Sequence, residues 1–303
     1  MSSRTDLAIE LLNEMKSIRN TADAGAEYND LPESGEGYTS KVYENESSVT
    51  TVIDVTDENG EKLFGKPRGR YVTVEVPPFG KDGEVADGRM EAIKAELSKM
   101  IPERGDVLVA GLGNRDITAD ALGPLAMTQI LATRHLSDRL SYEVGLSDLR
   151  DVSGIVPGVL GQTGIEVSDI VKSVADLVNP SAIITIDALA ARDLSRLGCT
   201  VQITDAGVAP GSGIGNGRPK INKQTMGVPV IAIGVPTVIS VSSLLEENLK
   251  SSTSHNPEDL KNLIVTPKDI DLLVARAARL ISLALNATLF PSLSTTDILS
   301  LIS

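Results

Sequence analysis

Residues 107–114 read VLVAGLGN, a short apolar run that passes directly into a glycine-rich turn. Four apolar residues followed by Gly111 and Gly113 are typical of a buried strand that ends in a tight turn. Helices are predicted next over roughly 121–137 and near 166–178, and a second buried strand over 182–186. Because strands and helices alternate, we expect a parallel sheet flanked by helices from about residue 100 onward.

Further elements extend this prediction toward both ends of the chain. The later elements are strands over 199–204 and 228–233 and a largely apolar helix over 267–289, with loops at 151–164 and 205–227. The earlier elements are an amphipathic helix over 6–18 capped by Thr5 or Asp6, a polar loop over 20–48, two β-like runs over 49–55 and 71–76 around a hairpin turn at Asn59-Gly60, and a helix over 90–100. The expected fold class is α/β, with a mostly parallel central sheet flanked by helices. We divide the chain into a smaller N-terminal part with the β-hairpin (1–100) and an α/β core (101–303), which is expected to hold the functional site.

Composition excludes several classes of partner. The 303 residues include 28 Lys+Arg and 41 Asp+Glu, which gives a net charge of −13, and there are only 5 Tyr, 3 Phe and no Trp. Nucleic-acid binders need a basic stripe or stacking aromatics, and anionic membranes repel an acidic protein. No apolar run reaches the roughly 18–20 residues of a membrane span, and the N-terminus lacks a signal-peptide stretch. We expect a cytoplasmic protein that binds neither nucleic acid nor membrane.

Thiol and imidazole chemistry is sparse. Cys199 is the only cysteine, so an intramolecular disulfide and a site of several thiolates are excluded. His135 falls late in the predicted helix 121–137 and His255 lies in a polar stretch, and neither has the surroundings of a catalytic base. We therefore expect no histidine-dependent nucleophile, no metal and no cofactor.

Two aspartates stand out by their positions. Asp120 ends the loop after the strand at 107–110, and Asp187 immediately follows the strand at 182–186. The carboxyl ends of parallel strands share one edge of a sheet, where α/β proteins build their sites. The two carboxylates could therefore meet in space, although position alone favours a simpler explanation. The competing explanation is that both are helix N-caps, for which Asp is a favoured residue.

Glycine-rich segments offer backbone N–H groups. Those of Gly111, Gly113 and Asn114 are candidates for contacts to a peptide or an oxyanion, or the glycines simply form a tight turn. A dinucleotide fingerprint would need glycine where Asp116 stands, and no P-loop lysine is present. Gly211 and Gly213 belong to a loop at 205–217 that is either a lid or peptide-binding wall or a flexible connection.

Residues 66–70, KPRGR, form a short basic segment. Short charge runs are usually solvated faces, and we favour that explanation. The alternative is a docking patch for an acidic substrate or a partner subunit.

Several long segments resemble the spore germination protease family, in the right order and over nearly the whole chain. They are residues 111–124, 133–136, 186–192, 204–213 and 227–238, together with RTDLAIE at 4–10 and GRYVT at 69–73. The resemblance implies an endopeptidase that degrades small acid-soluble spore proteins at germination, with Asp120 and Asp187 as its catalytic acids. It also implies a homotetramer in the spore core, made as a zymogen with a propeptide ahead of residues 4–10. Three residues precede that segment here.

Chemistry follows from the aspartate pair. Two close carboxylates do not both ionise, so one keeps a proton. The ionised one takes a proton from water while the protonated one polarises the scissile carbonyl; either aspartate could fill either role.

Two alternatives stay open. A weaker resemblance to hydrogenase maturation endopeptidases, which add a histidine to grip nickel in their substrate, suggests a metal-dependent enzyme, although that histidine has no obvious match here. The other alternative is a non-enzymatic α/β module that binds an anion through its glycine loops.

Overall fold

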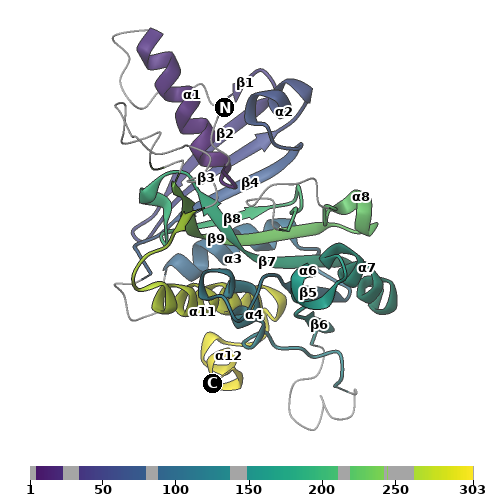
Figure 1. Ribbon diagram of the computed structural model, residues 1–303. Coiled ribbons are helices and arrows are strands. Elements are labelled where there is room, and N and C mark those ends of the chain that lie inside the picture. Colours follow the sequence, from purple (N-terminus) through teal and green to yellow (C-terminus); the bar gives the residue numbers. More distant parts are fainter. Residues whose placement is uncertain are drawn as a thin grey trace.

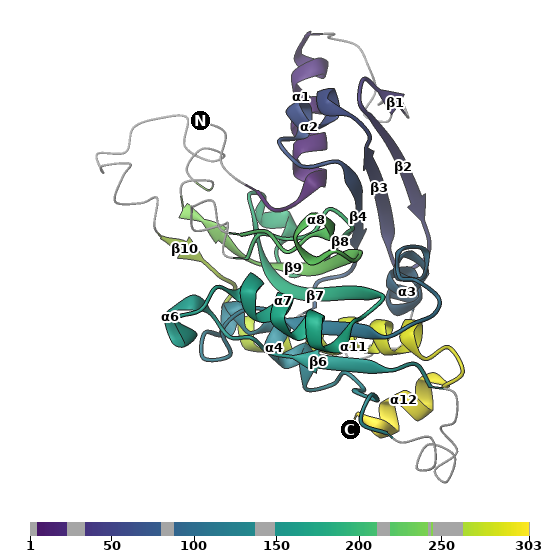
Figure 2. The same ribbon diagram turned by 90° about the vertical axis from the view of Figure 1, so that its right-hand side faces the viewer.

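A single mixed sheet of ten strands organises the protein, as seen in the computed structural model, which describes residues 5–22, 34–79, 88–136, 149–210, 219–241, 244 and 263–302. The strand order is β1-β2-β3-β4-β8-β9-β7-β5-β6, with β10 paired to β9. The strands are β1 (Ser34–Gly35), β2 (Tyr38–Glu44), β3 (Val49–Val55), β4 (Gly69–Glu75), β5 (Val107–Gly111), β6 (Val152–Ile155), β7 (Ala182–Ala191), β8 (Thr200–Thr204), β9 (Val230–Ser240) and β10 (Ile264–Val265). Figure 2 shows how strongly the sheet twists between β2 and β6.

Helices cover both faces of this sheet (Figure 1). They are α1 (Ala8–Ala22), α2 (Glu58–Phe64), α3 (Gly88–Met100), α4 (Leu122–Met127), α6 (Leu160–Thr163), α7 (Val167–Val178), α8 (Lys223–Met226), α11 (Ile270–Leu289) and α12 (Thr295–Leu301), with the 3-10 turns η1 (Thr118–Asp120) and η2 (Leu194–Arg196). The predicted helices over 90–100, 166–178 and 267–289 are confirmed as α3, α7 and α11.

The α/β fold class is confirmed, and the parallel strands gather where the sequence predicts the core. Strands β9, β7, β5 and β6 are parallel neighbours. Strand β8, which was expected to continue the parallel set, is antiparallel to both β9 and β4. The short link through η2 explains this, because a parallel return needs a crossover of a dozen or more residues.

Alternation along the strands builds a core on each face. Val107 and Val109 of β5 point toward α3, α4 and α11, whereas Leu108 and Ala110 point toward α7 and α8. Among the described residues, α11 is one helix that is long and apolar enough to cross a membrane by length and composition, although Asp271, Arg276 and Arg279 interrupt its apolar run. However, 72% of its most apolar window is buried inside the protein, as for a core helix.

The N-terminal strands continue the same sheet instead of forming a separate one. The predicted pairing of β3 with β4 is confirmed, but α2 stands where a turn at Asn59-Gly60 was expected. Asp57 is responsible, because its side chain accepts the N–H groups of Asn59 and Gly60 and so caps a helix. Helix α3 packs against α11 of the other part. The division at residue 100 stays a prediction.

Three further expectations about local structure are wrong. Strand β2 lies inside the predicted loop 20–48. The sequence did not predict this strand because its residues 41–44 are exposed and carry no alternating apolar signal. Strand β6 and helix α6 lie inside the predicted loop 151–164. The helix predicted over 121–137 ends at Met127, since the chain then turns so that Thr133 and Arg134 donate their N–H groups to the Val152 carbonyl.

Candidate active site

Asp187 lies on β7 at the point where the neighbouring strand stops. The last pair between β5 and β7 joins Gly111 to Ile186, and β7 then runs on to Ala191 with support from β9 on its other side. Asp187 was expected to follow a strand directly and is instead inside one, because β9 extends the ladder as far as Ile239. It is still the first residue of β7 beyond the end of β5.

Asp120 is brought to the same place by η1, which packs against β7 and β9. The register between β7 and β9 shifts after Leu189, so that Thr237 forms a bulge, and its hydroxyl donates to the Ala119 carbonyl at 2.6 Å. Bulges often re-aim a side chain next to a site. Thr237 thereby fixes η1, and with it Asp120, against the sheet.

The glycine turn after β5 makes this approach possible. Gly113 has a φ of +108°, and a Cβ there would lie 2.1 Å from the Asp120 carbonyl oxygen. A Cβ on Gly123 would lie 2.4 Å from the Ile186 carbonyl oxygen, and one on Gly111 would lie 2.4 Å from the Gly123 oxygen. The tight-turn explanation therefore accounts for these glycines, since each permits a close approach of backbones.

Asn114 orients Asp120. Its N–H is donated to the Asp120 carboxylate at 2.8 Å and to the Asp120 carbonyl at 3.1 Å. In place of the expected oxyanion contact, we therefore assign this N–H to Asp120. The Asn114 side-chain oxygen accepts the Asp116 N–H at 3.0 Å and the Gln162 amide at 2.8 Å, which holds the loop.

Burial raises the pKa of both carboxyl groups, and the charge of Asp120 acts on Asp187. Burial raises the pKa of Asp120, and the N–H of Asn114 opposes this effect. Burial raises the pKa of Asp187 well above its usual value, and the negative charges of Asp120 and Asp6 raise it further, against the hydrogen bond from the Ala188 N–H. A buried carboxyl group whose pKa is raised by a neighbouring carboxylate is typical of acid–base catalytic sites.

Asp6 is the residue that sequence reasoning missed. It was expected as an alternative cap for the first helix, but Thr5 accepts the Leu7 N–H. The Asp6 carboxylate instead accepts the Ala190 N–H at 2.8 Å. These two residues are 184 positions apart, so no local pattern could reveal the contact.

The other predicted residues are placed as follows. Gly211 and Gly213 lie outside the described residues. In the basic segment, the Lys66 ammonium donates to the carbonyls of Thr5 and Asp6. The Arg70 guanidinium lies 3.8 Å from the Asp54 carboxylate. The predicted solvated face therefore fits only Arg68, whose side chain is exposed. Within the part of the chain that the structure describes, no three His, Cys, Asp or Glu side chains are grouped to hold a metal ion.

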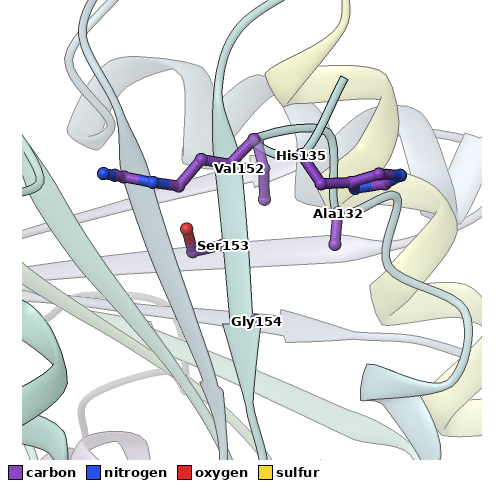
Figure 3. A pocket seen from close by; sticks show the side chains of 6 residues that line it. Ala132, His135, Val152, Ser153 and Gly154 are labelled. Carbon is purple, nitrogen blue, oxygen red and sulfur yellow. The ribbon is translucent and has the colours of Figure 1, made fainter. Parts of the chain in front are cut away.

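A separate pocket lies along β6 (Figure 3). It is lined by Ala132, Arg134, His135, Val152, Ser153 and Gly154, with a volume of about 420 Å³. Residues 152–154 pair with the first half of β5, whereas Asp120 and Asp187 lie beyond its end. Figure 3 shows His135 and Ser153 projecting in different directions, so they do not form a nucleophile and its base.

Thr237→Val should loosen Asp120 and, if Asp120 takes part in a reaction, weaken the activity without removing it. Loss of the hydroxyl leaves the Ala119 carbonyl unpaired, which costs about 1–2 kcal/mol, and loosens η1, which lowers kcat roughly tenfold. Thr237→Ser keeps the hydroxyl and serves as the matched control. Steady-state kinetics with thermal unfolding check both effects, and equal kcat values for the Val and Ser variants would contradict this role.

Comparison with known proteins identifies the family. A family model described as germination protease matches residues 14–262. The chain belongs to the germination protease family. It is 40% identical over 277 residues to the germination protease of Caldanaerobacter subterraneus subsp. tengcongensis, covering 80% of this chain and 85% of that protein. It is 34% identical over 328 residues to that of Clostridium perfringens, covering 97% of each.

Membership of this family makes the protein an endopeptidase, a hydrolase of peptide bonds, and decides against a non-enzymatic binding module. Among solved structures, the NiFe hydrogenase maturation protease HycI of Thermococcus kodakarensis matches with a TM-score of 0.35 and 16% identity, over 63% of this chain and 98% of that one.

Proposed function

We propose that this germination protease hydrolyses small acid-soluble spore proteins at the start of germination, and that Asp120 and Asp187 activate the attacking water. The observation that carries the proposal is the placement of both aspartates where β5 ends: Asp187 is the first residue of β7 beyond that end, and η1, which carries Asp120, packs against β7. The charge of Asp120 acts on Asp187 there. In a protease, such a pair can supply both the general base and the general acid.

The surroundings of the two carboxyl groups favour different roles. Asp120 receives a backbone N–H from Asn114, which stabilises its ionised form. Asp187 is more strongly disfavoured as an anion, because burial and two neighbouring negative charges act on it. The pair titrates as a unit, and its shared proton belongs mainly to Asp187. Asp120 then takes the proton from water, while Asp187 donates a hydrogen bond to the scissile carbonyl.

Assembly, location and activation belong to the proposal as well. We place the protein in the spore core as a homotetramer that is made as a zymogen. These features rest on the family alone. The basic segment 66–70 contributes less to a subunit contact than its charge suggests, because Lys66 and Arg70 have partners within the chain.

Digestion of a purified small acid-soluble spore protein tests the substrate and the chemistry together. The intact protein is incubated with this substrate, with and without a strong chelator, and fragments are mapped by mass spectrometry. We expect a few defined internal cuts at a rate that the chelator does not change, because carboxylates alone supply the acid and the base. Loss of cleavage with chelator, restored by nickel or zinc, favours the hydrogenase-maturation type of chemistry instead. Absence of any cut contradicts the proposed substrate.

A further inference from the structure

The N-terminal segment, residues 5–7, occupies the edge of β7 directly beyond the end of β5. Leu112 donates its N–H to the Ile186 carbonyl at 2.8 Å, as the last contact on the β5 side. Four residues further along β7, Asp6 donates its N–H to the Ala190 carbonyl at 3.1 Å. Residues 186 and 190 face the same edge of the strand. The segment therefore lies along the same edge of β7 as β5, beyond the point at which β5 stops and Asp187 follows.

Four contacts lock this segment in place. The Asp6 carbonyl accepts the Lys66 ammonium at 3.0 Å and the Gln202 amide at 2.8 Å. The Gln202 side-chain oxygen accepts the Ala8 N–H, and the Asp6 carboxylate accepts the Ala190 N–H, both at 2.8 Å. The carboxylate is therefore held at a defined point on β7.

The same segment covers the face of β7 that carries Asp187. Leu189 and Ala191 alternate with Asp187 on this face, and both belong to the cluster formed with Leu7 and Ile9. Because the segment is packed as well as hydrogen-bonded, the Asp6 charge stays near Asp187.

The charged groups around the pair are few in the described part of the chain. Asp120 from η1 and Asp6 act on Asp187. Lys66, whose pKa is lowered by burial, faces Asp6 and Glu10. Glu10 accepts the N–H groups of Arg192 and Asp193 and is not among the charges that act on Asp187.

We propose that Asp6 is a positioning residue of the aspartate pair, whose docked carboxylate keeps the shared proton on Asp187. This inference rests on the proposed function of Asp120 and Asp187. A fixed negative charge beside Asp187 makes ionisation of that group costlier, so the acid stays protonated to higher pH. The protonated fraction, and with it the activity, therefore depends on the N-terminal segment being docked.

Asp6→Asn tests the charge without removing the contact. Asparagine keeps a side-chain oxygen for the Ala190 N–H but carries no charge. We expect the alkaline limb of the kcat–pH profile to move to lower pH, with a loss of roughly three- to tenfold in rate on that limb, because the protonated fraction falls about tenfold for each pH unit by which the limb moves. Asp6→Glu, which keeps the charge, should recover much of the wild-type limb.

Glu10→Gln is the matched control, because Glu10 also holds the N-terminal segment through backbone N–H groups. It should leave the limb in place. An unmoved limb in Asp6→Asn contradicts the inference, and so does an equal displacement in Glu10→Gln. Thermal unfolding establishes that each variant is folded, and Asp6→Ala, with both charge and contact removed, should show at least the same displacement. If Asp187→Asn is inactive while Asp6→Asn has a normal profile, only this inference fails; if Asp187→Asn stays active, the proposed function fails.

Discussion

Asp187→Asn is expected to abolish peptide cleavage while the fold persists. Asparagine has nearly the same shape but does not donate an acidic proton to the scissile carbonyl, so we expect the rate to fall roughly 10³-fold or more. Asp120→Asn should fall similarly, because it removes the group that takes the proton from water. Initial rates on a small acid-soluble spore protein measure both losses.

Asp116→Asn provides a control from the same loop. Asp116 is exposed and contacts Asn114 and Gln162, so its substitution removes a charge close to the site without touching the pair. Its rate should stay close to that of the intact protein. Turnover near the wild-type level in Asp187→Asn would show that the pair does not perform the chemistry.

Asp187→Asn should also make the protein more stable at neutral pH. Because the pKa of Asp187 is raised in the folded state, the native protein holds this proton more tightly than the unfolded chain does. Stability from this group is therefore fully present below the ordinary aspartate pKa and is lost as the pH rises through the raised value. Asparagine avoids the loss, so we expect a gain of about 1–2 kcal/mol at pH 7 and none at pH 3. Unfolding in denaturant at both pH values measures the difference.

Gly113→Ala is expected to cause the second large effect. Alanine is strained at a φ of +108°, and its Cβ would lie 2.1 Å from the Asp120 carbonyl oxygen. That oxygen belongs to the backbone, so the clash is relieved only if the loop that carries Asp120 shifts. A displacement of about 1 Å lowers kcat roughly 100-fold, and the strain should cost about 2–4 kcal/mol of stability.

Gly164→Ala separates conformational strain from displacement of Asp120. Gly164 has a comparable φ of +70°, but a Cβ there meets nothing within 4 Å. We expect this variant to lose about 1 kcal/mol and to keep its activity. Steady-state kinetics and thermal unfolding of the two variants decide the matter. If Gly113→Ala and Gly164→Ala have the same kcat, the glycine turn does not position Asp120.

Local patterns predicted much of the fold, and their failures have physical causes. The buried runs at 107–110 and 182–186 and the apolar helix at 267–289 carry strong periodic signals, so their elements were expected correctly. Strand β2 has exposed side chains along its second half and is ordered by pairing with β3, a contact that composition does not reveal. Helix α2 depends on a single cap, Asp57, which is also a common turn residue.

Some residues of the candidate site could be suggested from the sequence, and others could not. Asp120 and Asp187 became candidates because parallel strands end at one edge, and the family resemblance then singled them out; their catalytic role stays a prediction. The roles of Asn114 and Thr237 depend on a few hydrogen bonds, from the Asn114 N–H to Asp120 and from the Thr237 hydroxyl to Ala119, which no sequence pattern reveals. Asp6 meets β7 only through tertiary docking, so its contact with Ala190 on the strand that carries Asp187 emerges from the three-dimensional structure alone.

The most direct test of the aspartate pair compares the two single variants with Asp120→Asn/Asp187→Asn. Groups that act as one catalytic unit have strongly non-additive effects. We predict that the double variant cleaves the spore protein no more slowly than either single variant, since each substitution alone already disables the pair. Independent losses that multiply in the double variant, or substantial turnover in either single variant, would contradict the account.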